Sequence, residues 1–380
     1  MSTRSGQYVL QPQGYKAFIP KSLPPDPPID FGEDFLELLS TADRALARLD
    51  GSIQTLPNPD LFVFMYIRRE AVLSSQIEGT QASLQDVVEA ESQLFDPERP
   101  DDVGQVLNYI DAMNHGLERL TALPISMRLI CDIHRLLLSG VRGQDHRPGE
   151  IRQKQNWIGP DNCLLPDATF VPPPHIDVPR CLSDLEKFLH SDIPMPPLIK
   201  IGLAHAQFET IHPFADGNGR VGRLLITLLL CEKQILQTPI LYLSVFFKAN
   251  RTRYYELLQA TRDEGNWEAW LKFFLQGVAE TSRAATLTAR DIVALREAHR
   301  HLILDRFGRT AGNGIALLEG LFQAPVVTVN QVTEKLELSY SSANDLVSRF
   351  VDAQLLEEGT GQSRNRKFFY RPYIRLFSDL

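Results

Sequence analysis

The stretch that decides the fold and the chemistry spans residues 212–223 and reads HPFADGNGRVGR. It places two glycines around an asparagine, directly before the strongly apolar segment 219–234, which we expect to be a helix. Backbone N–H groups at the start of a helix form an anion-binding site, and glycine allows a phosphate to come close. The stretch therefore predicts a phosphate-binding turn at a helix N-terminus.

The side chains of this stretch supply the other groups that phosphoryl or nucleotidyl transfer needs. His212 has a pKa range suited to a general base, and Asp216 is a hard oxygen ligand suited to Mg²⁺. Arg220 and Arg223 lie about one helical turn apart and form a fork for phosphate oxygens. Each feature alone is more often structural, so the prediction depends on their combination within one short segment.

Composition limits the class of protein. The 380 residues carry a net charge of −8, which gives no support to a general nucleic-acid binder. The four cysteines have no zinc-binding spacing. No signal peptide is recognisable, and the longest apolar run, 224–231, is far shorter than the roughly 20 residues of a membrane span. These features predict a reduced, cytoplasmic protein without membrane segments.

Outward from this segment, hydrophobic periodicity predicts a mainly α protein in four parts. We expect an extended, proline-rich arm over 1–30, a helical region over 31–115, a helical core over 116–284, and a linker helix with a separate unit over 285–380. The Gly- and Pro-rich segment 140–179 is expected to be a loop with a short hairpin.

The C-terminal unit shows the pattern of a winged helix. Three helices are predicted at 315–322, 330–336 and 341–353, followed by hairpin strands at 355–356 and 367–370 around a Gly359/Gly361 turn. From residue 326 to the end, seven basic residues balance seven acidic ones, and only Arg364, Arg366 and Lys367 form a basic patch. Because phosphate contacts need cations, DNA binding is weakly supported, and dimerisation or target docking is preferred.

Residues 212–223 match, position by position, the signature H-x-F-x-[DE]-G-N-G-R-x-x-R, so the chain resembles the Fic family. The resemblance implies a Fic-fold helical core and transfer of AMP from ATP to a Ser, Thr or Tyr hydroxyl of a protein. His212 is then the base that takes the hydroxyl proton, Asp216 holds Mg²⁺, and Phe214 anchors the core. The implied ATP-binding residues are Gly217, Asn218, Gly219, Arg220, Val221, Gly222, Arg223 and Tyr254.

Two further segments resemble parts of the same family. Gly149-x-x-Arg152, Asn156-Trp157-Ile158-Gly159 and Phe170–Pro173 resemble the flap that aligns a target segment by adding it as a strand. Asn250-Arg251 followed by Tyr254-Tyr255 resembles the helix that closes over the adenosine, where Tyr254 stacks on or hydrogen-bonds the nucleoside. A structural loop and a buried core tyrosine are the alternatives.

Ser74-Ser75-Gln76-Ile77-Glu78-Gly79 resembles the inhibitory motif [ST]-x-x-x-E-[GN]. Glu78 is expected to end a helix, where a carboxylate meets the negative end of the helix dipole and needs a cation. The resemblance implies that this cation is Arg223, that Glu78 occupies the γ-phosphate site, and that Ser74 steadies it. A solvated surface glutamate is the alternative.

The expected partners are ATP with Mg²⁺ and a target protein, which includes the chain itself. Several alternatives stay open: transfer of UMP, phosphate or phosphocholine on the same fold; removal of AMP, alone or in addition; and a DNA-binding regulator that uses the winged helix. The sequence also leaves the oligomeric state open, and a homodimer is one option.

Overall fold

The structure is a computed structural model that describes residues 3–54, 59–91, 102–141, 143–160, 163–359 and 366–377. It is mainly α-helical, as the sequence predicts. The helices are α1 (Glu33–Gln54), α2 (Asp60–Ile77), α3 (Leu84–Glu91), α4 (Asp102–Leu120), α5 (Met127–Leu137), α6 (Val178–His190), α7 (Pro197–Ile211), α8 (Asn218–Glu232), α9 (Ser244–Ala249), α10 (Arg251–Glu264), α11 (Trp267–Arg306), α12 (Ala311–Gln323), α13 (Val329–Leu336), α14 (Tyr340–Asp352) and α15 (Arg371–Arg375). The strands are β1 (Gly6–Leu10), β2 (Lys16–Pro20), β3 (Val326–Val327), β4 (Glu357–Glu358) and β5 (Phe368–Phe369).

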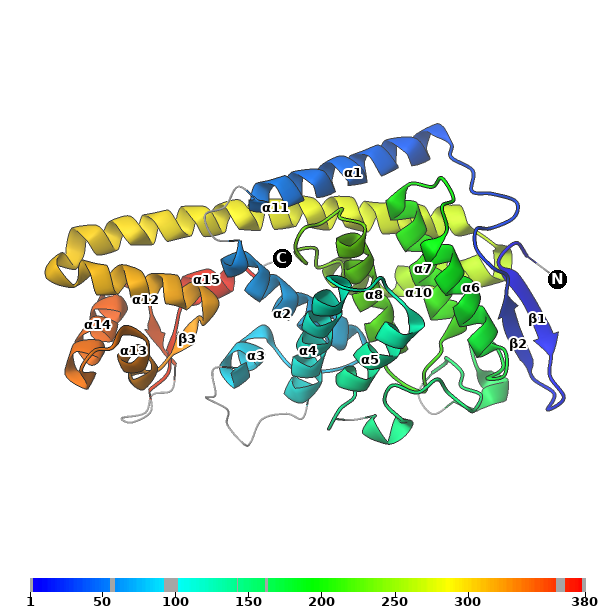
Figure 1. The fold of residues 1–380 in the computed structure, drawn as a ribbon, viewed down its shortest axis with the longest axis horizontal. Helices are drawn as coiled ribbons and strands as arrows, with labels where there is room; N and C mark the ends of the chain where they lie inside the picture. Colours follow the sequence, from blue (N-terminus) through cyan, green and yellow to red (C-terminus); the bar gives the residue numbers. More distant parts are fainter. Residues whose placement is uncertain are drawn as a thin grey trace.

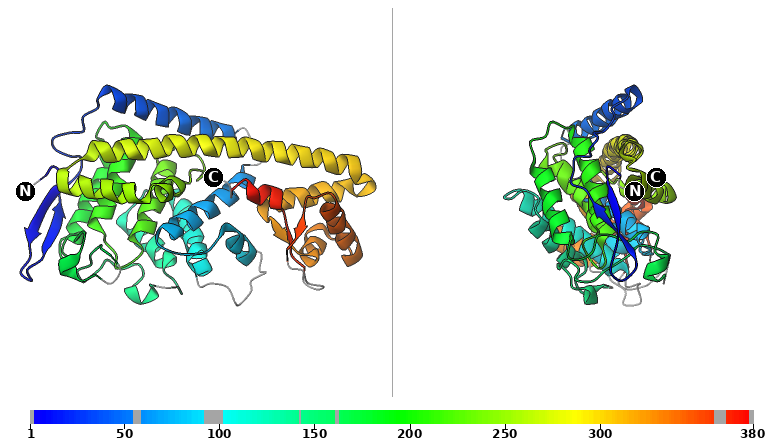
Figure 2. Two further views of the ribbon diagram at one scale, coloured as in Figure 1. Left: turned by 180° about the vertical axis from the view of Figure 1, so that it is seen from behind. Right: turned by 90° about the vertical axis from the view of Figure 1, so that its right-hand side faces the viewer.

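One long helix organises the molecule. Figure 1 shows α11 running along its length, with α1 beside it, helices α4–α8 and α10 beneath one part, and α12–α15 beneath the other. The view from behind in Figure 2 shows the same arrangement, with β1 and β2 at the end opposite to α12–α14. Apolar residues of α1 recur every three to four positions, from Phe35 to Ile53, and are buried. The core therefore lies between α11 and the helices that cover it.

The predicted boundary near residue 284 falls inside a helix. Residues Trp267–Arg306 form one continuous helix, α11, so the predicted core and the predicted linker helix are joined without a break, and the division into domains stays a prediction. No proline interrupts residues 267–306, and Ala289, Ile292 and Ile303 remain buried along the whole length. The C-terminal unit is thus connected through an unbroken helix.

The N-terminal arm is a β-hairpin, which the sequence analysis did not predict. β1 pairs with β2 in antiparallel register, Tyr8 opposite Phe18, and Gly14 turns the chain with φ +89°. β2 also reaches the predicted flap, because the Phe18 N–H donates to the Val171 carbonyl at 2.9 Å. The arm is therefore hydrogen-bonded to the flap, a contact between distant segments that local periodicity does not reveal.

The C-terminal unit contains the three predicted helices as α12, α13 and α14. Its strands form an antiparallel sheet in the order β3-β5-β4, of which β3 was not predicted. The first hairpin strand lies at 357–358 rather than at Leu355-Leu356, because Gln354 (φ +59°) ends α14 and both leucine N–H groups donate to the Phe350 carbonyl. Gly361 and Arg364 lie outside the described residues.

Two predictions concern the chain as a whole. Among the described residues, no helix is both long enough and apolar enough to cross a membrane. All four cysteines are free thiols. Cytoplasmic localisation itself stays a prediction.

Candidate active site

The HPFADGNGRVGR segment forms a tight turn between α7 and α8. His212 ends α7 in a left-handed conformation (φ 49°), and Gly217 (φ 77°) precedes the first residue of α8. The buried Asn218 side chain fixes the turn: its Oδ1 accepts the Phe214 N–H at 2.8 Å, and its Nδ2 donates to the Phe214 carbonyl at 2.8 Å. Phe214 is 1% exposed and is part of the core, as expected for an anchor.

We expect Asn218→Ala to lower the free energy of unfolding by about 1–3 kcal/mol, because the buried Phe214 N–H loses its partner, while the Phe214 carbonyl keeps only the Asn156 amide. Chemical unfolding followed by circular dichroism measures the loss. Asn114→Ala, at an exposed position of α4, is the matched control and should be nearly neutral. Equal stabilities of the two variants would contradict the role of Asn218 in the turn.

His134 of α5 packs against the turn, a contact that the sequence did not predict. Its ring stacks on Phe214 with centroids 3.8 Å apart. The Gly149 N–H donates to Nδ1 at 2.8 Å, so the ring proton is on Nε2, which donates to the Asp216 carbonyl at 3.0 Å. Burial lowers the pKa of His134 to about 4, which keeps this neutral tautomer. A single histidine within a helical pattern gave no signal of this role.

Two residues of the predicted flap segment also hold the turn. The buried Arg152 donates from Nε to the His212 carbonyl at 2.9 Å and from Nη2 to the Pro173 carbonyl at 2.5 Å. Asn156 Nδ2 donates to the Phe214 carbonyl at 3.0 Å. The flap itself is a single antiparallel bridge between Ile158 and Phe170. The flap and the signature turn therefore form one rigid unit.

Arg223 and Glu78 form an ion pair, as the resemblance implies. Nη2 of Arg223 lies 2.6 Å from Glu78 Oε1 and also donates to the Ser74 carbonyl, while Nε donates to Ser74 Oγ. Burial disfavours the charge of Glu78, but Arg223, with Arg220 and His212, outweighs it and lowers the pKa of this carboxyl. Glu78 is the C-cap residue of α2, next to Gly79 (φ +101°), so the predicted helix end and its cation are both present.

The Glu78 carboxylate lies directly over the start of α8. A Cβ placed on Gly219 would be 2.3 Å from Glu78 Oε1 and 3.0 Å from Arg223 Nη1. The first N–H groups of an α-helix have no partner within the helix and attract anions. Glu78 is thus the anion that faces this helix N-terminus, and Gly219 leaves the room for it. Arg220 turns away from Arg223 and donates to Gln105 Oε1 of α4 at 3.1 Å.

His212 is a neutral base in a cationic setting. Burial, reinforced by the charges of Arg262 and Arg152, lowers the pKa of His212 to about 3. On its Nδ1 side lies Glu209, whose Oε2 is 4.0 Å away. Burial raises the pKa of Glu209 to about 7. Sequence reasoning missed Glu209, although its position one turn before His212 on a helix was a readable signal.

A cavity of about 530 Å³ opens beside these groups. Its lining contains predicted residues from the signature turn, the flap, the inhibitory motif and the helix α10, namely His212, Gly219, Arg223, Trp157, Ile158, Gly159, Glu78 and Tyr254. Tyr254 is 1% exposed, and its hydroxyl lies 2.8 Å from His205 Nε2, so it belongs mostly to the core. The neighbouring Tyr255, which is 40% exposed and lines the same cavity, is better placed to contact a nucleobase.

Of the predicted ATP-binding residues, only Gly219, Arg223 and Tyr254 line this cavity. The Val221 side chain is 1% exposed and is part of the core. Gly222 packs against Phe208 and Glu209, and a Cβ there would be 2.4 Å from Glu209 Oε1. Both positions pack against the core, and their part in ATP binding stays a prediction.

Asp216 is the one acidic side chain of the turn and is 40% exposed. Its Oδ1 accepts the Gly217 N–H at 2.6 Å, and Oδ2 faces His146 Nδ1 at 4.0 Å. Among the described residues, no cluster of three or more His, Cys, Asp or Glu side chains could hold a metal ion. Any cation at Asp216 would therefore take further ligands from substrate and water, which is how Mg²⁺ commonly binds.

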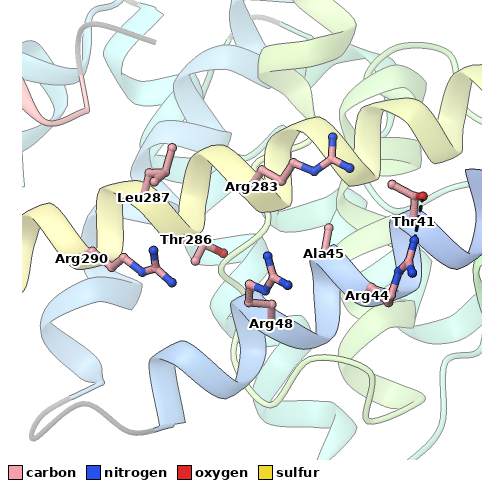
Figure 3. Close-up of a pocket in the computed structure, with 8 residues that line it drawn as sticks. All are labelled: Thr41, Arg44, Ala45, Arg48, Arg283, Thr286, Leu287 and Arg290. Atoms are coloured by element: carbon pink, nitrogen blue, oxygen red, sulfur yellow. Dashed lines mark hydrogen bonds between the residues drawn. The ribbon is translucent and has the colours of Figure 1, made fainter.

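A second cavity, of about 410 Å³, lies between α1 and α11, away from the signature turn. Figure 3 shows Arg44 and Arg48 of α1 and Arg283 and Arg290 of α11 around it. Its lining contains neither a carboxylate nor a histidine, so it lacks a base or metal ligand. The residues of the signature turn line the cavity beside His212 instead.

Comparison with known proteins identifies the class. A model of the Fic/DOC family N-terminal region matches residues 36–118, and a model of the Fic/DOC family matches residues 124–230. Together the two models match half of the chain and include both Glu78 and the signature turn. This protein belongs to the Fic/DOC family.

Particular relatives agree with that assignment. A probable protein adenylyltransferase of Aquifex aeolicus is 35% identical over 96 residues, which is 25% of this chain and 28% of that protein. A protein adenylyltransferase Fic of Drosophila ananassae is 30% identical over 159 residues, which is 41% of this chain and 28% of that protein. The matches thus span less than a third of these relatives. A Fic family protein of Desulfovibrio desulfuricans, solved by crystallography, shares the fold with TM-score 0.58 at 19% identity, over 90% of this chain and 97% of that one.

Proposed function

We propose that this protein is a protein adenylyltransferase, which transfers AMP from ATP to a protein hydroxyl and releases pyrophosphate. The observation that carries the proposal is the joint position of His212, the N-terminus of α8 and the Arg223–Glu78 pair around one cavity. The names of the matched relatives, which are protein adenylyltransferases, support the same reaction.

The roles follow from the chemistry of each group. The neutral His212 imidazole takes the proton of the target hydroxyl. The N–H groups of Asn218 and Gly219 and the guanidinium group of Arg223 bind the phosphates, whereas the Gly217 N–H and Arg220 are held by Asp216 and Gln105. Tyr254 and Tyr255 face the adenosine. Glu78 holds Arg223 and covers the start of α8, so ATP cannot place its γ-phosphate there until Glu78 moves.

Asp216 would hold Mg²⁺. Its carboxylate is 40% exposed and lies just before α8, so it would be one protein ligand of a cation whose other ligands would come from substrate and water. When bound, Mg²⁺ neutralises charge on the phosphates. Two hydrogen bonds hold Asp216 in place: the Gly217 N–H donates to its carboxylate, and His134 Nε2 donates to its backbone carbonyl.

The flap offers an edge for the target. The Val171 carbonyl accepts the Phe18 N–H, and Phe170 forms a bridge with Ile158, so residues 170–171 are hydrogen-bonded on both sides. Among the described residues, the backbone groups of Trp157 and Gly159 have no strand partner on the outer side. An extended target segment can add there as a strand, with Trp157 (40% exposed) as an apolar contact.

A double-label experiment tests the reaction. The protein is incubated with Mg²⁺ and ATP labelled at either the α- or the γ-phosphate. We expect label to remain on protein only from the α-position, and to disappear when EDTA removes Mg²⁺. Stable label from the γ-phosphate would indicate phosphate transfer instead, and label from UTP would indicate UMP transfer. Loss of AMP from a pre-modified substrate would indicate that the protein removes AMP by hydrolysis.

DNA binding by the C-terminal unit stays a prediction, and the wing cations give it little support. Arg366 donates to Asn344 Oδ1 at 2.9 Å, and Lys367 lies 3.6 Å from Glu89 of α3. Both cations are therefore engaged within the protein. A gel shift of DNA fragments at rising salt tests the prediction, because phosphate contacts weaken steeply with salt. A homodimer stays a prediction as well.

A further inference from the structure

The neighbouring side chains of His212 and Glu209 each carry a buried polar atom without a side-chain partner. Within the described residues these atoms are His212 Nδ1 and Glu209 Oε1, although the Glu209 backbone carbonyl also lies near the His212 ring. The Glu209 side chain is 8% exposed, and its other oxygen, Oε2, lies 4.0 Å from His212 Nδ1. Buried polar groups are normally hydrogen-bonded, so an unpaired atom on each of two adjacent side chains needs an explanation.

The surroundings of Glu209 fix its backbone and leave room for its carboxyl beside His212. Pro213 has no N–H to give to the Glu209 carbonyl four residues before it, and Arg262 Nη2 of α10 donates there instead at 3.2 Å. Gly222 of α8 leaves the space for the carboxyl, because a Cβ would be 2.4 Å from Oε1. Gly222 thus leaves room for the carboxyl, and Arg262 fixes the backbone of Glu209.

The proposed reaction gives the His212 ring a positive charge, which the Glu209 carboxylate can stabilise. After taking a proton, His212 becomes an imidazolium ion, and the nearby charges of Arg262 and Arg152 oppose that ion. A carboxylate on the Nδ1 side stabilises an imidazolium and selects the tautomer whose Nε2 carries the lone pair. Glu78 is held by Arg223, so Glu209 is the closer and uncommitted carboxyl.

We propose that Glu209 is a positioning residue for His212, whose carboxylate accepts the Nδ1–H hydrogen bond and directs Nε2 to the target hydroxyl. The inference rests on the proposed AMP transfer. In that step the hydroxyl oxygen bonds to the α-phosphorus while its proton passes to His212 Nε2. The bond from the α-phosphorus to the bridging oxygen breaks, and pyrophosphate leaves with that electron pair. Glu209 keeps its negative charge throughout.

The charges facing Glu209 predict how it responds to pH. Burial and the charge of Glu78 raise the pKa of Glu209, whereas Arg223 of α8 and Arg262 of α10 lower it. In Glu78→Gly the repulsion from Glu78 disappears and Arg223 is no longer neutralised, so the pKa of Glu209 falls below about 7. The rate of Glu78→Gly should therefore rise with pH as Glu209 ionises and then level off.

The test compares variants in the Glu78→Gly background. Single-turnover AMP transfer is measured across pH for Glu209→Gln, and for Glu232→Gln as a matched control at the far end of α8, where Glu232 accepts the Ile125 N–H. We expect Glu209→Gln to lower the rate by roughly 10- to 100-fold and to remove the pH step, because the neutral amide cannot stabilise the imidazolium. ATP affinity and thermal midpoint should be unchanged, and Glu232→Gln should retain the full rate.

A second measurement does not need transfer. Nitrogen NMR of ¹⁵N-histidine protein, with the His212 signals assigned by their loss in His212→Asn, reports the tautomer of this ring. We expect the Nδ1–H form with Glu209 and a mixture of both tautomers in Glu209→Gln. The same tautomer and the same pH profile in both proteins would overturn the inference. If Glu78→Gly transfers no AMP, the proposed function fails, while the tautomer still decides the role of Glu209.

Discussion

Glu78→Gly is expected to raise AMP self-labelling by about 10²- to 10³-fold, because it releases Arg223 to bind a phosphate and uncovers the start of α8. In the structure, the Glu78 carboxylate pairs with Arg223 at 2.6 Å and lies against Gly219. A guanidinium that is already paired cannot hold the γ-phosphate. Labelling from ATP with a label at the α-phosphate, followed over time, measures the change.

The control removes a similar ion pair elsewhere. Glu91 of α3 pairs with Arg68 of α2, away from the cavity. Glu91→Gln should leave labelling at the wild-type rate, whereas Glu78→Gln should raise it, since the amide keeps the shape but not the charge. Equal labelling by wild type and Glu78→Gly would show that Glu78 does not inhibit. Loss of labelling in Glu78→Gly would instead favour a reaction that needs Glu78.

His212→Asn in the Glu78→Gly background is expected to slow AMP transfer by about 10²- to 10⁴-fold, the usual contribution of a general base. Asparagine is chosen because His212 has φ 49°, a conformation that asparagine adopts more readily than alanine. The turn should therefore survive, and ATP affinity should change little, because His212 is not among the phosphate-binding groups. Single-turnover rates and ATP titration measure the two effects separately.

His301→Asn, at an exposed position near the end of α11, is the matched control and should retain the full rate. His212→Ala would add the cost of alanine in a left-handed conformation, so a lower thermal midpoint for alanine than for asparagine is expected. An unchanged transfer rate in His212→Asn would assign the proton to another group and would contradict the proposed base.

Local sequence features predicted much of the fold. The helix predicted at 219–234 is α8 (Asn218–Glu232), and the C-cap of α2 is Glu78, beside Gly79, as predicted, because glycines and helix ends act locally. The β-hairpin of the arm, strand β3 and the continuity of α11 were not predicted. Strand pairing and helix continuity depend on contacts between distant segments, which periodicity within a short window does not report.

The sequence by itself determined the kind of chemistry, since a histidine, an aspartate, glycines and arginines at fixed spacing around a helix start define a phosphate site. Only the tertiary structure decided which side chains face the cavity. It placed Val221 in the core, brought His134 and Arg152 beneath the turn, and set Glu209 beside His212. Spacing fixes what lies along one helix, whereas the packing of separate helices fixes what meets across them.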